Sequence, residues 1–243
     1  MQKEWFSSWF DTPYYHTLYK NRDYEEASLF IDTITQFLTL KPNAVCWDLC
    51  CGKGRHSIYL NKKGFRVIGT DLSEQSICEA NESANDTLQF YQHDMRKLFR
   101  TNYFDVVFNV FTSFGYFEKR EDDFHVFDSV QKALKPSGLF VFDYLNSEYV
   151  KGIIKAHDAI TMDGITFNIS KKIENNTIIK SIDFIDKGTS FHFEERVKLF
   201  DKTYFEGLAK ECNLTILNAF GNYQLQKFDV KTSPRLILVL QKK

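Results

Sequence analysis

The chain has 243 residues, of which 43% are hydrophobic and 16% aromatic, and 31 basic against 32 acidic side chains give a formal net charge of −1. Such a balance argues against a protein built to attract nucleic acid or an anionic membrane surface. No apolar run reaches the roughly 18 residues that a membrane-spanning helix needs, and the first five residues lack the pattern of a secretory signal. We therefore expect a cytoplasmic protein with a sizeable core and no membrane partner.

The first forty residues form a region of their own. Aromatic side chains crowd residues 5–19, and Pro13 divides them into two pieces. This segment either packs on the core as a helix or covers a site as a lid. Residues 21–40 carry apolar side chains at helical spacing. Residues 1–40 are thus predicted to be an N-terminal aromatic helical segment or lid.

Strand-like and helix-like segments then alternate, which is typical of a doubly wound parallel sheet. This pattern defines a core over residues 41–149. The expected strands are 44–49, 65–70, 88–92, 104–109 and 139–144, and the expected helices are 55–63, 74–85 and 121–134.

Three of these strands have an aspartate at or just beyond their carboxyl end. Asp48, Asp71 and Asp94 follow one another at intervals of 23 residues, and a turn containing Gly52 and Gly54 comes directly after the first. The carboxyl ends of parallel strands form one edge of a sheet, where ligands bind. Glycine permits a sharp turn and a close approach of ligand to backbone. The sequence therefore predicts a ligand site at this edge.

After residue 150 the pattern changes to short alternating runs separated by Asp163-Gly164, Asn175-Asn176 and Lys187-Gly188. Such runs indicate antiparallel hairpins, so residues 150–200 are predicted to be an inserted β-ribbon. Residues 201–243 then supply a helix and strands that complete the core sheet. An exposed ribbon edge offers a place for a second copy of the chain, which makes a homodimer a hypothesis.

The five cysteines have no paired framework, which favours reduced thiols in a reducing compartment. The adjacent residues Cys50 and Cys51 leave two interpretations open: they are ligands for a soft metal, or small apolar packing residues (filler) beside the turn. The second is preferred, and no metal site is predicted.

The stretch Asp48-Leu49-Cys50-Cys51-Gly52-Lys53-Gly54 resembles the glycine motif of class I S-adenosylmethionine-dependent methyltransferases, with Cys50 in place of the first glycine. The resemblance covers about residues 40–145 and continues through the last helix and strands. It is greatest to the small-molecule branch, in which a β-insertion and an aromatic N-terminal segment shape the acceptor pocket. It implies a Rossmann-like α/β fold with a mostly parallel seven-stranded sheet, and S-adenosyl-L-methionine as the cofactor.

The resemblance also implies roles for individual residues. Asp71 would hold both ribose hydroxyls, Asp94 would accept from the adenine amino group, and Leu72 and Met95 would sandwich the adenine ring. Asp48 would lie near the ammonium group of the methionine portion. The methionine portion would lie over Cys51-Gly52-Lys53-Gly54, with Cys50 at the position of the first glycine of the motif. The remaining implied cofactor contacts are Asn109 and Phe111 at the methyl group, and Arg22 at the carboxylate.

Methyl transfer from a sulfonium is an in-line displacement that alignment and exclusion of water can largely catalyse. The sequence accordingly singles out no general base. The acceptor is expected to be a small molecule such as an amino sugar, amine or phenol. Candidate pocket residues are Tyr14, Tyr15, His16, Tyr116 and Tyr144.

Three other classes of protein share parts of this pattern. A nicotinamide dinucleotide oxidoreductase needs Gly-x-Gly-x-x-Gly, but Ser57 stands at the third glycine. An RNA methyltransferase should carry a basic face or an added RNA-binding module, which the charge balance does not favour. A nonenzymatic binding protein on the same fold would keep the cofactor site without turnover.

Overall fold

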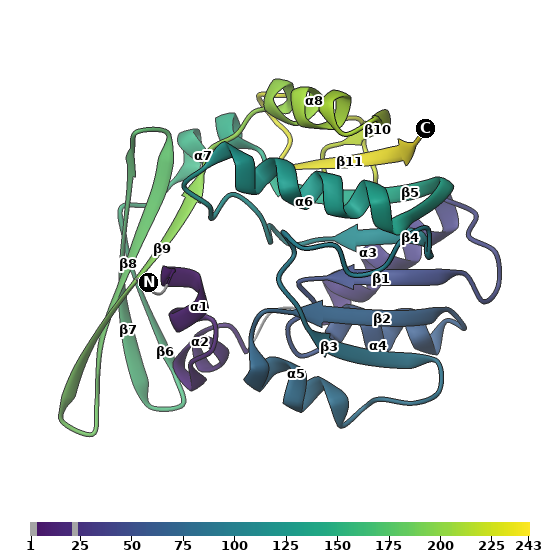
Figure 1. The fold of residues 1–243 in the computed structure, drawn as a ribbon. Helices are drawn as coiled ribbons and strands as arrows, with labels where there is room; N and C mark the ends of the chain where they lie inside the picture. Colours follow the sequence, from purple (N-terminus) through teal and green to yellow (C-terminus); the bar gives the residue numbers. More distant parts are fainter. Residues whose placement is uncertain (1–3, 21–23) are drawn as a thin grey trace.

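The computed structural model describes residues 4–20 and 24–243, and over these residues it shows a seven-stranded sheet beside a four-stranded one (Figure 1). The strands of the large sheet are β1 (Val45–Leu49), β2 (Arg66–Asp71), β3 (Leu88–Gln92), β4 (Phe104–Asn109), β5 (Leu134–Leu145), β10 (Leu214–Phe220) and β11 (Arg235–Lys242). Their order is β10-β11-β5-β4-β1-β2-β3; β11 pairs antiparallel with both β10 and β5, and the other neighbouring strands pair parallel. The predicted doubly wound, mostly parallel sheet is confirmed.

Helices cover both faces of this sheet because successive strand residues point to opposite sides. Trp47 and Val107 belong to one core cluster, whereas their neighbours Cys46 and Val106 belong to the other. Within the described residues, no helix is both long and apolar enough to cross a membrane. One face carries α3 (Tyr24–Phe37), α4 (Arg55–Lys62) and α5 (Glu74–Asn81), and the other carries α6 (Arg120–Ala133) and α8 (Lys202–Glu211).

The inserted ribbon is a four-stranded antiparallel sheet. Its strands follow chain order and are β6 (His157–Met162), β7 (Ile165–Glu174), β8 (Thr177–Asp186) and β9 (Thr189–Lys198). Each predicted turn pair has positive φ at both residues, with 50° and 80° at Asp163 and Gly164. Positive φ at both central residues is the geometry that two-residue hairpins prefer, so the turn chemistry set the strand register.

The aromatic N-terminal segment forms two short helices, α1 (Trp5–Trp9) and α2 (Pro13–Leu18), as the break at Pro13 predicts. Thr12 caps α2 by accepting from the amide of Tyr15 at 3.1 Å. Trp9 is buried in a cluster with Phe167 and Phe184 of the small sheet. Both helices lie between the small sheet and the carboxyl ends of the parallel strands (Figure 1).

Local differences from the expected elements have local causes. Helix α7 (Ser147–Ile153) was not predicted, and the expected start of the insertion, residue 150, falls inside it. β5 begins at Leu134, five residues early, because residues 135–138 make an irregularity within the strand and do not precede it. α5 ends at Asn81 and not at residue 85, since Asn85 forms a bridge with Leu88.

Candidate active site

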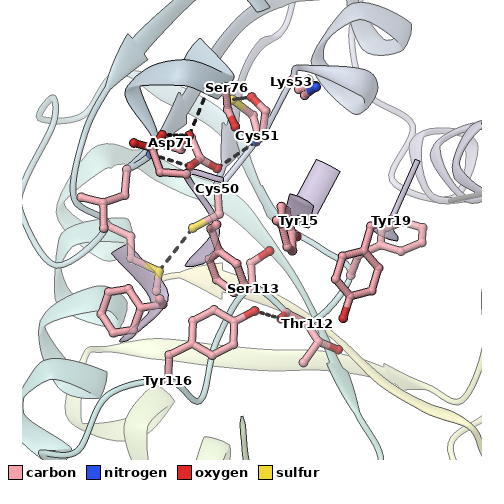
Figure 2. A pocket seen from close by; sticks show the side chains of 18 of the residues that line it. Tyr15, Tyr19, Cys50, Cys51, Lys53, Asp71, Ser76, Thr112, Ser113 and Tyr116 are labelled. Atoms are coloured by element: carbon pink, nitrogen blue, oxygen red, sulfur yellow. Dashed lines mark hydrogen bonds between the residues drawn. The ribbon is translucent and has the colours of Figure 1, made fainter. Parts of the chain in front are cut away.

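A cavity of about 840 Å³ lies between the carboxyl ends of the parallel strands, α1, α2 and β9. Its core wall consists of the turn after β1, the ends of β2 and β3, and the turn after β4. The opposite wall is mainly aromatic and belongs to the N-terminal segment (Figure 2). Eleven of the predicted site residues line this cavity, on one wall or the other: Cys50, Cys51, Gly52, Asp71, Leu72, Asp94, Met95, Phe111, Tyr15, His16 and Tyr116.

The turn after β1 uses three left-handed residues, with φ of 65° at Cys50, 55° at Gly52 and 80° at Gly54. A Cβ added at Gly52 would meet nothing within 4 Å, so open space lies above this residue. A Cβ at Gly54 would lie 2.7 Å from the ring of Phe90. Gly54 is thus required for packing beneath the turn, whereas Gly52 leaves the backbone open to a ligand.

Asp71 is held in a fixed orientation at the end of β2. Its Oδ2 accepts from the amide of Gly52 at 2.8 Å, and its Oδ1 accepts from the amide of Ser73 at 2.9 Å. Burial raises the pKa of this carboxyl, while the backbone bonds act in the opposite direction. Each carboxylate oxygen has a second lone pair, so Asp71 keeps acceptor capacity for hydroxyl groups.

Asp94, after β3, is bound to a neighbouring arginine. Arg96 donates from Nε at 3.0 Å and from Nη2 at 2.7 Å, and it also pairs with Glu4 of the N-terminal segment at 3.0 Å. Burial acts to raise the pKa of Asp94, but the hydrogen bonds from Arg96 lower it below its usual value. Asp94 therefore faces the cavity as a charged acceptor already linked to the aromatic wall.

Three predicted cofactor residues do not line the cavity. Asp48 is 1% exposed, and its Oδ2 accepts from Ser57 Oγ at 2.6 Å below the turn. Asn109 is buried and donates to the carbonyl of Leu49 at 3.2 Å, while its own Oδ1 has no hydrogen-bond partner. Gly54 packs on Phe90, as described above. The predicted Arg22 lies outside the described residues.

Two predicted pocket tyrosines are corrected by the structure. Tyr14 points away from the cavity, because its ring packs on Phe184 and Phe191 and its hydroxyl donates to Asp186 at 2.9 Å. Tyr144 is fully buried in the core, where its hydroxyl donates to the carbonyl of Lys198. The other three predicted pocket residues, Tyr15, His16 and Tyr116, line the cavity. Figure 2 shows the two tyrosines among them.

Sequence reasoning missed Glu195, a carboxylate of β9 on the far wall of the cavity. Its Oε1 accepts from Trp9 Nε1 and from the Tyr19 hydroxyl, both at 2.7 Å, and Lys180 lies 3.4 Å from Oε2. Side chains alternate along β9, so Glu195 lies on the same strand face as Phe191 and Phe193. The apolar character of that face is the sequence feature that could have predicted that the Glu195 carboxylate points toward the cavity.

The adjacent cysteines are poorly arranged for a metal. Cys50 Sγ lies 3.4 Å from Met95 Sδ, whereas Cys51 Sγ lies 3.5 Å from the carbonyl of Gly52. Burial, together with nearby carboxylates, raises the pKa of both thiols well above the usual value. Because the thiolate is the metal-binding form, this environment favours the filler interpretation.

Comparison with known proteins agrees with this geometry. Residues 47–138 match the family described as "Methyltransferase domain". The methyltransferase-named protein YqeM of Bacillus subtilis strain 168 is 39% identical over 105 residues, which is 41% of this chain. A second methyltransferase-named protein, from Geobacillus sp. strain WCH70, is 33% identical over 99 residues. The matched segment spans only about two fifths of either relative, 42% and 40%.

Similar solved structures cover nearly the whole chain. An S-adenosylmethionine-dependent methyltransferase from Clostridium acetobutylicum ATCC 824 has a TM-score of 0.79 at 22% identity, over 94% of this chain and 96% of that one. CalS10, an amino pentose methyltransferase from Micromonospora echinaspora, has a TM-score of 0.69 at 16% identity, over 92% and 93%. At these identities the likeness shows the fold. The glycine turn and the match of residues 47–138 to a methyltransferase-domain family support a class I S-adenosylmethionine-dependent methyltransferase.

Proposed function

We propose that this protein transfers a methyl group from S-adenosyl-L-methionine to a small-molecule acceptor. One observation carries the proposal: a single cavity joins the Gly52–Asp71 edge of the sheet to an aromatic wall that ends in a carboxylate. The first part suits a nucleoside with an amino-acid side arm. The second part suits a second, smaller molecule.

The residues on the core wall fit this cofactor. Asp71 offers oriented acceptors for ribose hydroxyls, and the open space above Gly52 accommodates a ligand against the backbone. Leu72 and Met95 provide apolar contacts beside the charged acceptor Asp94. The cofactor supplies an electrophilic methyl group on a sulfonium. The protein supplies alignment and a water-poor cavity, with the rings of Trp5, Phe10 and Tyr116 on its far side.

An amine is the acceptor class that the far wall supports best. Glu195 is a largely buried carboxylate among aromatic rings, and both features stabilise a cationic or hydrogen-bond-donating group. Lys180 neutralises part of its charge, so an amine that also carries hydroxyl groups suits the wall better than a simple cation. Among the structural neighbours, CalS10 is described as an amino pentose methyltransferase and KedS8 as a sugar N-methyltransferase, which gives a reason to include amino sugars in a test.

The direct test is transfer of labelled methyl groups to a panel of amino sugars, simple amines, phenols and RNA. We expect product with an amine of the panel and none with RNA. Activity on RNA alone would overturn the proposal. The oxidoreductase alternative is not favoured, because the position of its third motif glycine is occupied by Ser57, whose hydroxyl donates to Asp48. Binding of reduced nicotinamide dinucleotide, measured by fluorescence, would support that alternative. A cytoplasmic location and a homodimer stay predictions from the sequence.

A further inference from the structure

The turn after β4 holds two successive residues in a conformation that neither favours. Phe111 has φ of 60° and Thr112 has φ of 61°, and neither is glycine. Left-handed φ costs a non-glycine residue about 1–2 kcal/mol, and threonine is further restricted by its branched Cβ. Both residues line the cavity. Such a conformation persists only where the surrounding structure holds it.

A buried ion pair holds this turn from the core side. Asp143 of β5 is wholly buried; its Oδ2 accepts from the Phe111 amide at 2.7 Å, and its Oδ1 accepts from Arg235 Nε at 2.8 Å. Its backbone carbonyl accepts from the Thr112 amide at 3.2 Å. Arg235 of β11 also donates from Nη2 to Thr112 Oγ1 at 2.7 Å. The pair therefore bonds to both strained residues.

The turn determines where two rings of the cavity lining lie, those of Phe111 and Tyr116. The Phe111 ring is stacked on His56 at 4.9 Å and lies 5.1 Å from the ring of Tyr223. The Tyr116 hydroxyl donates to the Thr112 carbonyl at 2.5 Å, a bond that Figure 2 shows. Displacement of the turn would therefore shift both the Phe111 ring and the Tyr116 ring.

An ion pair is a costly way to join two strands. A buried pair must offset the desolvation of both charges, and apolar residues of similar size would often hold β5 to β11 at least as well. The neighbouring strand residues Phe142 and Leu236 are apolar and fully packed. Apolar residues could not, however, form the hydrogen bonds that Asp143 and Arg235 make to Phe111 and Thr112.

We propose that Asp143 and Arg235 are positioning residues, which hold the strained Phe111–Thr112 turn so that the cavity wall is aligned for methyl transfer. This inference rests on the proposed function for its catalytic part. Its structural part, that the pair holds the turn, does not.

The test replaces Arg235 by lysine, which keeps a positive charge beside Asp143 but cannot bond to Asp143 and Thr112 through one planar group. Amide hydrogen exchange of the protein alone is measured first. We expect exchange at Phe111 and Thr112 to become about tenfold faster or more, with β2 unchanged. The exposed Arg66→Lys serves as the matched control and should leave exchange in both the turn and β2 unchanged. Unchanged exchange at the turn in Arg235→Lys would overturn the inference.

Turnover is measured next, on the most active amine of the panel. Arg235→Lys should lower kcat about tenfold or more, while affinity for S-adenosylhomocysteine changes little. In a Thr112→Gly background, where glycine tolerates the left-handed conformation, the same replacement should cost about twofold at most. An equal loss in both backgrounds, or faster exchange with kcat unchanged, would overturn the positioning role. If the wild type methylates nothing, the proposed function fails, and hydrogen exchange still decides whether the pair holds the turn.

Discussion

The backbone amide of Gly52 donates to Oδ2 of Asp71 at 2.8 Å, which joins the turn after β1 to the end of β2. The bond fixes a carboxylate at the edge of the cavity, directly beside the open backbone of the turn. A second bond from the Ser73 amide fixes the other oxygen. The predicted cofactor site is therefore a preformed feature of the sheet edge, and not a property of any mobile side chain.

The two glycines of the turn should respond differently to replacement by alanine. Gly54→Ala forces a Cβ to 2.7 Å from Phe90 and should lower the free energy of unfolding by about 2–4 kcal/mol, from overpacking plus left-handed strain. Gly52→Ala adds strain without a clash, so about 1–2 kcal/mol is expected. Its larger effect should be on S-adenosylhomocysteine affinity, since the new methyl group enters the open space. Urea unfolding and calorimetry separate the two effects; a greater loss of stability in Gly52→Ala would contradict this account.

Asp48 should make stability depend on pH. Burial raises its pKa from 3.8 to about 6, with the Ser57 hydrogen bond acting the other way. The folded state therefore binds this proton more tightly, and the resulting stabilisation, complete below pH 3.8, is lost as pH rises through about 6. Asp48→Asn still accepts from Ser57 but does not ionise. Its stability relative to wild type should rise by on the order of 3 kcal/mol between about pH 4 and pH 7.

Urea unfolding of both proteins across this range checks the pH prediction. Asp123 also has its pKa raised to about 6 by burial, but it is common to both proteins and cancels in the difference. A difference between wild type and Asp48→Asn that stays constant with pH would show that Asp48 does not titrate as described.

Glu195 should affect the acceptor and not the cofactor. Glu195→Gln removes a charge-assisted acceptor from the far wall, so the KM for an amine acceptor should rise by about tenfold or more. Affinity for S-adenosylhomocysteine should stay the same. Glu194→Gln is the matched control, because its side chain lies on the other face of β9 and pairs with Arg196. Equal kinetics in the two variants would remove Glu195 from acceptor recognition.

Much of the sheet could be predicted because its signals are local. The strand that ends at Asp48, the turn with Gly52 and Gly54, and the acidic end of β2 all lie within about one βαβ unit. The hairpin turns were likewise readable from residue pairs such as Asp163-Gly164. Helix α7 was missed because seven residues that include Gly152 carry little periodic signal.

The contacts that were missed are long-range. Glu195 meets Trp9 across 186 positions, and Arg235 meets Asp143 across 92. No periodic pattern reports which side chains two distant elements bring together. Tyr144 was misplaced for the same reason, since its position at the end of an expected strand suggested the sheet edge, whereas the return of residues 198–200 buries it.

The central claim is that Asp71 binds the ribose of S-adenosyl-L-methionine, and calorimetric titration with S-adenosylhomocysteine tests it most directly. The wild type should bind, and Asp71→Ala should bind about 100-fold more weakly or worse, because two charge-assisted hydrogen bonds are lost. Asp86→Ala, an exposed carboxylate beyond α5, should bind like the wild type. Undiminished affinity in Asp71→Ala, or no binding by the wild type, would contradict the claim.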